Sequence, residues 1–136
     1  MQYYQAKAGK IPGTNFKEVY TKAFSIFLVI KKKSKRKPHI RSKYFKKEKI
    51  FLHLYWEHLF GKENWRDRMR RIALYAAALE VMQKSTVAPE IKQNPNRKSE
   101  ILYRFFGITK EKEKLVVQIK EDVKSKQKFL ISIFPA

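Results

Sequence analysis

The sequence contains no cysteine, which excludes disulfide bonds and thiolate metal sites. It has only four glycines, and none belongs to a glycine-rich loop that could cradle phosphates, so we do not expect a nucleotide-hydrolysing enzyme. Its twelve Asp and Glu residues are scattered, without DxD or HxxxH spacing. Metal-dependent hydrolysis needs clustered carboxylates or imidazoles, so we expect neither a metal nor another cofactor.

Long apolar runs are also lacking. Runs such as Phe24 to Ile30 are far too short to span a bilayer. The first residues, MQYYQAKAGK, contain no apolar core segment of the kind found in signal peptides. We therefore expect a cytoplasmic protein with no membrane partner.

Positive charge is abundant: 32 Lys and Arg against 12 Asp and Glu give a formal net charge of +20. Self-repulsion on this scale destabilises a compact chain and usually serves a polyanionic partner such as nucleic acid. A hydrophobic content of 43% argues against a disordered basic tail. At 136 residues, we expect a single basic domain over residues 1–136.

The last third of the chain predicts three short β-strands, Ile101–Phe106, Leu115–Lys120 and Lys128–Phe134. These runs are rich in Ile, Val, Phe and Tyr and are separated by polar connections, as in antiparallel strands. Upstream segments favour helices, so we predict an α+β fold. In it, N-terminal helices pack on a small antiparallel β-sheet of at least three C-terminal strands.

Alternation assigns the side chains of these strands to two faces. One face is apolar apart from a single hydroxyl: Ile101, Tyr103, Phe105, Leu115, Val117, Ile119, Phe129, Ile131 and Ile133. The other mixes apolar with polar groups: Leu102, Arg104, Phe106, Val116, Gln118, Lys120, Leu130, Ser132 and Phe134. The mixed face is either a binding or catalytic platform or simply a solvated sheet face.

The N-terminal two thirds predict helices between polar segments. Residues 1–13 are expected to form a poorly ordered lead-in, and 85–98 a loop containing two prolines. Helices are expected at 15–31, capped by Thr14 or Asn15; at 47–60, stopped by Gly61; and at 64–84, capped by Asn64.

Between the first two expected helices lies the run KKKSKRKPHIRSKYFKKEK, residues 31–49, with a single acid. One interpretation is a flexible, solvated charge run. The other is a basic arm that grips phosphates while bases stack on its aromatic rings. The second interpretation predicts nucleic-acid-binding roles for Arg36, Arg41, Lys43 and Tyr44.

The third expected helix carries Arg66, Arg68, Arg70 and Arg71 in its first two turns. Cations at a helix N-terminus oppose the macrodipole, so a cluster there suggests an anionic partner. Pairing with Glu63 and Asp67 is the alternative, and it could neutralise two of them at most. We predict that Arg66, Arg70 and Arg71 bind nucleic acid, together with Lys120 on the mixed sheet face.

His58 lies at the end of the apolar stripe of the second expected helix. It is either a half-buried packing residue or a general acid or base. Metal-free RNA cleavage needs only a base, an acid and cations, because the ribose 2′-hydroxyl is the nucleophile. A sufficient set, if the fold brought its members together, would be Arg104, Lys120 and Ser132 on one sheet face with His58 and an arginine of the third helix nearby.

The layout resembles the BECR superfamily of ribonucleases, which includes barnase-like, EndoU-like, colicin-like and RelE-like enzymes and phage-associated branches. The resemblance covers residues 49–134 and rests on a helix histidine, a loop ending NPNR, a strand LYRFFG and a terminal strand FLISIFP. It implies catalytic roles for His58, Arg104 and Ser132, with Tyr103 and Gln118 as additions. No glutamate falls on that face of the expected strands, so the general base is unassigned.

The resemblance implies a toxin-like, metal-independent endoribonuclease that cleaves tRNA or mRNA by attack of the 2′-hydroxyl on the phosphodiester. Its implied partner is an acidic antitoxin or immunity protein. The alternative is a non-catalytic nucleic-acid-binding protein that uses the same basic face.

Overall fold

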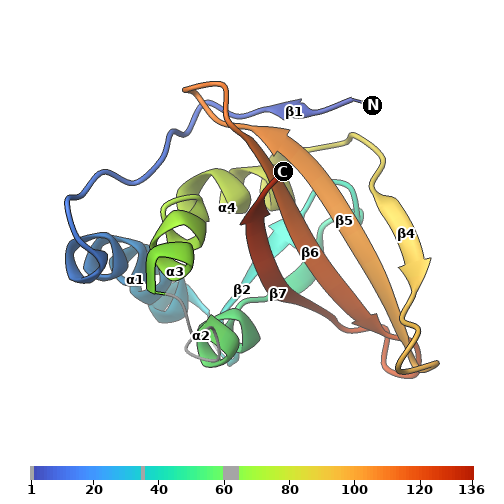
Figure 1. Ribbon diagram of the computed structural model, residues 1–136. Coiled ribbons are helices and arrows are strands. Elements are labelled where there is room, and N and C mark those ends of the chain that lie inside the picture. The colour runs from blue at the N-terminus through green and yellow to red at the C-terminus, as the bar shows by residue number, and fades with distance from the viewer. Residues whose placement is uncertain (1, 35, 60–64) are drawn as a thin grey trace.

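The computed structural model describes residues 2–34, 36–59 and 65–136, and in them four helices and seven strands (Figure 1). The expected caps Gly61 and Asn64 lie outside these residues. The helices are α1 (Phe16–Lys33), α2 (His53–Leu59), α3 (Trp65–Ile72) and α4 (Tyr75–Lys84). The strands are β1 (Tyr4–Gln5), β2 (His39–Ser42), β3 (Glu48–Phe51), β4 (Glu90–Gln93), β5 (Glu100–Ile108), β6 (Lys114–Asp122) and β7 (Lys128–Pro135).

All seven strands belong to one curled sheet, with the helices gathered to one side of its long strands (Figure 1). The strand order is β1-β5-β6-β7-β3-β2, and β4 also pairs with β5. The pairs β1–β5 and β3–β7 are parallel, whereas the others are antiparallel. The α+β class is confirmed, but the expectation of a small antiparallel sheet was wrong because four strands arise outside the C-terminal third.

The three C-terminal strands are confirmed, each longer than predicted. Their alternation is interrupted once. Gln118 pairs with Ser132 but Ile119 pairs with Leu130, so a β-bulge skips Ile131. Leu130 is therefore in the core and Phe129 lies on the Lys120 side, the reverse of the predicted faces.

The first helix is confirmed as α1, and the side chain of Asn15 caps it by accepting from the Glu18 N–H at 3.0 Å. The helix expected over 47–60 was partly wrong, since its first residues form β3 and only His53–Leu59 is helical. The helix expected over 64–84 is broken into α3 and α4. At the break, the freed Ala73 carbonyl accepts from the Ile11 N–H at 2.8 Å.

Much of the basic run lies in regular elements. Its residues 31–33 end α1, and residues 39–49 belong to the antiparallel hairpin β2–β3, which β3 joins to β7. Burial of Ile40 and Ile50 explains the anchoring of this hairpin in the sheet. Its turn places Lys46 and Lys47 at positive φ, without glycine or asparagine.

In the segment expected as a lead-in, residues 2–13 contact the rest of the domain. β1 runs parallel to β5, and the side chains of Ala6 and Ile11 are buried. The Glu80 carboxylate of α4 accepts from the Tyr4 hydroxyl at 2.8 Å and from the Lys7 and Ala8 N–H groups at 2.8 and 3.0 Å. In the expected loop 85–98, β4 adds an edge strand to β5.

An aromatic cluster fixes α2 against α1 and α4. The Trp56 ring lies 5.1 Å from Phe24 and 5.0 Å from Tyr75, centroid to centroid, and its Nε1–H donates to the Tyr75 hydroxyl at 3.3 Å. This packing holds the short helix in place and with it His58 in its last turn. None of the helices among the described residues has the length and apolarity needed to cross a membrane.

Candidate functional site

A polar row crosses the centre of the sheet on its mixed face. Arg104 of β5 is directly opposite Gln118 of β6, which is directly opposite Ser132 of β7. Residues paired in this way point to the same side of a sheet. The Arg104 Nε–H donates to the Gln118 side-chain oxygen at 2.9 Å. Three of the predicted site residues are therefore neighbours.

Arg71 of α3 extends this row beyond β7. Its Nη1 donates to the Ser132 hydroxyl at 3.4 Å, and its Nε donates to the Asp67 carboxylate at 2.7 Å. The guanidinium carbon lies 5.6 Å from the centroid of the Phe134 ring. Helices α2 and α3 both contact β7, so the helices bring a histidine and an arginine to the row.

These elements enclose a cleft of about 460 Å³. Four predicted site residues line it: His58 from α2, Arg71 from α3, Lys120 from β6 and Ser132 from β7. The His58 side chain is exposed, as an acid–base group must be to reach a substrate. Arg104 and Gln118 adjoin the cleft through Ser132 without lining it.

Glu100 also lines the cleft, and the sequence reasoning missed it. Its carboxylate is 13% exposed; it accepts from Lys120 Nζ at 3.3 Å and from Asn94 Nδ2 at 2.9 Å. The predicted strand began one residue later, at Ile101. Extending the alternation by that one position would have placed Glu100 on the face of Arg104, so the expected lack of a glutamate there was wrong.

Tyr55, on the first turns of α2, is a second missed residue. Its side chain lines the cleft and is 3% exposed, yet its hydroxyl has no hydrogen-bond partner in the part of the chain that the structure describes. Burial raises the pKa of Tyr55 well above its usual value, so the phenol stays protonated as a donor. An unpaired buried hydroxyl costs about 1–3 kcal/mol, which a cleft ligand could recover.

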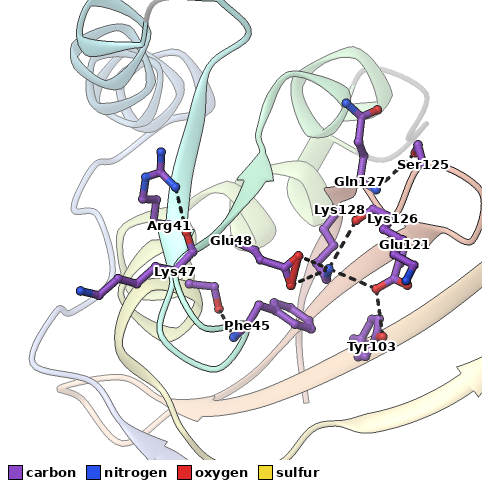
Figure 2. A network of polar contacts seen from close by, with 11 residues as sticks. Arg41, Phe45, Lys47, Glu48, Tyr103, Glu121, Ser125, Lys126, Gln127 and Lys128 are labelled. Atoms are coloured by element: carbon purple, nitrogen blue, oxygen red, sulfur yellow. Dashed lines mark hydrogen bonds and ion pairs between the residues drawn. The ribbon is translucent and has the colours of Figure 1, made fainter.

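Tyr103 is separated from this cleft because it points to the opposite face of the sheet. Figure 2 shows its hydroxyl directed at Glu121, to which it donates at 3.1 Å. The buried Lys128 ammonium pairs with Glu121 and Glu48, at 3.2 Å each. Burial, and then the hydrogen bond to Glu121, raises the pKa of Tyr103 to about 12. The structure thus gives Tyr103 a supporting place in a partly buried ion network, away from the predicted catalytic set.

The remaining predicted nucleic-acid-binding residues lie on other surfaces. Arg70 lines a separate hollow with Lys10 and Glu113, and Arg66 lies on the exposed side of α3. Arg36 and Arg41 line a basic groove beside β2, and Lys43 is exposed in the hairpin turn. Tyr44 is half-buried, and its ring packs against the core with its centroid 5.4 Å from that of Phe105.

The cleft is electropositive. Among the described residues that line it, Arg71, Arg97 and Lys120 are cations and Glu100 is the one carboxylate. A positive, partly enclosed cleft attracts phosphate groups and stabilises charge that develops on them. Nowhere in residues 2–34, 36–59 and 65–136 do three His, Asp or Glu side chains gather closely enough to hold a metal ion.

Comparisons of the chain with protein-family models, with curated proteins and with solved structures gave no match.

Proposed function

We propose that the protein is a metal-independent endoribonuclease whose active site is the cleft between α2, α3 and the mixed face of the sheet. The supporting observation is that His58, Glu100 and two cations, Arg71 and Lys120, converge on one cleft from four different elements. An imidazole, a carboxylate and cations are the groups that attack by a 2′-hydroxyl requires.

In the proposed reaction, Glu100 accepts the proton of the ribose 2′-hydroxyl while that oxygen forms a bond to phosphorus. The bond from phosphorus to the 5′-oxygen breaks, and His58 donates a proton to the leaving oxygen. The products are a 2′,3′-cyclic phosphate and a 5′-hydroxyl. Arg71 and Lys120 stabilise the added negative charge of the phosphorane, because ion–ion attraction is strong in a partly enclosed site.

The hydroxyl groups of the cleft would orient the phosphate. Tyr55 has an unused O–H to donate, and the Ser132 hydroxyl is already fixed by Arg71. Arg104 and Gln118 would act one step away, by holding Ser132 and the adjoining face in position. Tyr103 has no part in this scheme, since it lies on the other face.

The test is single-turnover cleavage of tRNA and of a generic mRNA in EDTA with saturating protein. His58→Ala and Glu100→Gln should each slow cleavage by about 10²–10⁴-fold, the usual contribution of an acid or a base, with little loss of affinity. Glu113→Gln is the matched control for Glu100→Gln, because this exposed glutamate pairs with Lys10 and does not line the cleft; it should keep the wild-type rate. RNA with a 2′-deoxy sugar at the cut site should remain intact.

The alternative function is non-catalytic binding of nucleic acid. It is favoured by a second basic surface, a groove of about 680 Å³ whose described lining includes Lys33, Arg36, Lys37, Arg41 and Lys49 and no carboxylate. On this alternative RNA stays intact but shifts on a gel. His58→Ala and Arg104→Ala then both weaken binding by modest, similar amounts. Arg104→Ala also makes affinity depend less steeply on salt concentration.

As part of the same proposal, the enzyme acts in the cytoplasm on tRNA or mRNA, and an acidic antitoxin or immunity protein restrains it. Such an inhibitor would cover the cleft with carboxylates that pair with Arg71 and Lys120, in the place of phosphates. A short Asp- and Glu-rich peptide should therefore inhibit cleavage in competition with RNA, and less so at high salt.

A further inference from the structure

A second row of side chains crosses the sheet beside the cleft. His39 of β2 pairs with Phe51 of β3, Phe51 pairs with Phe129 of β7, and Phe129 pairs with Lys120 of β6. Directly paired residues share a face. The sheet register therefore aligns three aromatic rings and one ammonium group across four strands, and the ammonium group already lines the cleft.

The contacts within this row agree with the register. The ring centroids of His39 and Phe51 are 6.0 Å apart, those of Phe51 and Phe129 are 5.6 Å apart, and Lys120 Nζ lies 5.6 Å from the Phe129 centroid. All three rings are only partly buried. They form a strip of aromatic surface that begins at the cleft and ends in the basic groove, where His39 and Phe51 are lining residues.

Cations flank the strip at its far end. Arg41 and Lys49 are paired two positions from His39 and Phe51, and they line the same groove with Lys37. Packing of the hairpin against β7 and against His53 of α2 explains apolar rings. It does not require the rings to stay partly exposed, or to be bordered by cations in a groove whose described lining has no carboxylate. Aromatic faces beside cations are the combination that binds the bases and phosphates of single strands.

We propose that His39, Phe51 and Phe129 form a stacking site for single-stranded RNA that leads into the cleft, with Lys120 at the junction. The choice of RNA as the ligand rests on the proposed function. Two or three bases stack on the strip, as on the aromatic residues of other RNA-binding sheets, while Arg41 and Lys49 hold the phosphates. A duplex is a poor ligand, since its bases are already paired and stacked.

The test compares a trinucleotide with an RNA of about ten nucleotides, a length that covers the cleft and the strip. Fluorescence anisotropy in EDTA, with 2′-O-methyl sugars to prevent cleavage, reports affinity. Phe129→Leu, Phe51→Leu and His39→Ala should each weaken binding of the longer RNA by about tenfold and leave the trinucleotide unchanged. Leucine keeps the apolar packing, and Ile91→Ala on the exposed side of β4 is the control that should change neither.

Equal losses of affinity for both RNA lengths, or no loss for either, would overturn the stacking site. It would also be overturned if duplex RNA competed as well as single-stranded RNA. The two proposals fail separately. Strip-dependent binding of an RNA that is never cleaved refutes the ribonuclease and keeps the stacking site. If His58→Ala abolishes cleavage while the strip variants bind both RNA lengths as the wild type does, the ribonuclease is kept and the stacking site is refuted. Circular dichroism of each variant confirms that the fold is retained.

Discussion

At the level of single residues, Tyr55 and Tyr103 contrast in one respect: the hydroxyl of Tyr55 has no hydrogen-bond partner among the described residues, whereas that of Tyr103 donates to Glu121. Tyr55 is buried against the cleft with an unpaired hydroxyl, so Tyr55→Phe removes a group that the folded protein does not use. We expect the free energy of unfolding to stay unchanged or to rise by up to about 1 kcal/mol, while cleavage or RNA affinity falls. Urea unfolding and the EDTA cleavage assay measure the two effects; unchanged cleavage would exclude Tyr55 from the site.

Tyr103→Phe should give the opposite pattern. The change removes the hydrogen bond to Glu121 and should lower the free energy of unfolding by about 1 kcal/mol. The rate of cleavage should not change, since the ring faces away from the cleft. A loss of rate in folded Tyr103→Phe protein would restore the catalytic role that the resemblance implied for this residue.

Lys128, with a side chain that is 5% exposed, is the centre of the ion network in Figure 2. Lys128→Met leaves the half-buried Glu121 carboxylate without its cation, so we expect a loss of about 3 kcal/mol in the free energy of unfolding. Lys10→Met is the matched control, because its pair with Glu113 is exposed and should contribute less than about 1 kcal/mol. Similar losses from both changes would contradict the network's importance.

At the level of elements, Glu80 of α4 attaches the N-terminal segment. Burial raises the pKa of this carboxyl, but hydrogen bonds from Lys7, Tyr4 and Ala8 outweigh burial, and the net pKa is lowered. Because the pKa is lowered in the folded state, the ionised Glu80 carboxylate stabilises the attached segment fully above its ordinary pKa, about 4.3. This stabilisation is lost as the pH falls through the lower pKa of the folded state. We expect residues 4–8 to detach in acid before the rest of the domain unfolds.

Hydrogen exchange of the Lys7 and Ala8 amides measures this detachment. Protection should fall below about pH 4 in the wild type. In Glu80→Gln it should be weak already at neutral pH, with no further step in acid. Glu90→Gln is the control that should behave as the wild type, because all four residues of β4 are exposed. Protection that is equal in wild type and Glu80→Gln would show that β1 pairing alone holds the segment.

The elements that could be predicted are those that residues close together in the sequence mark. Alternating apolar runs located β5, β6 and β7, and Asn15 located the start of α1. The β2–β3 hairpin was missed because Ile40 and Ile50 are almost its only buried apolar residues, and its turn uses Lys46 and Lys47 at positive φ where glycine or asparagine would signal a turn. The break before α4 contains neither proline nor glycine, so no local signal marks it; what accompanies it is a contact distant in sequence, from the Ile11 N–H to the Ala73 carbonyl.

The candidate site was predictable to a similar degree. Strand parity placed Arg104, Gln118 and Ser132 on one face, and this holds because β-pairing preserves alternation. The bulge at Ile131 could not be read from the sequence, and it exchanged Phe129 with Leu130 between the faces. The approach of His58 and Arg71 depends on how α2 and α3 pack along β7, which is a property of the whole fold.

At the level of the whole molecule, the net charge of +20 has opposite consequences for stability and for binding. Self-repulsion destabilises the folded chain, and salt screens it within a Debye length of about 10 Å at 0.1 M. Salt also competes with Lys and Arg for phosphates, which lowers RNA affinity. We therefore expect the urea midpoint of unfolding to rise with sodium chloride while RNA affinity falls.

The slope of log affinity against log salt makes this prediction quantitative. Each phosphate contact on a single strand contributes about −0.7 to that slope. Lys49→Gln in the basic groove should make the slope shallower by about that amount, whereas Lys110→Gln, in the exposed β5–β6 connection, should leave it unchanged. Equal effects of the two changes would mean that RNA responds only to the total charge. A midpoint that falls with salt would mean that ion pairs such as Lys128 with Glu121 outweigh the repulsion, even in a chain this basic.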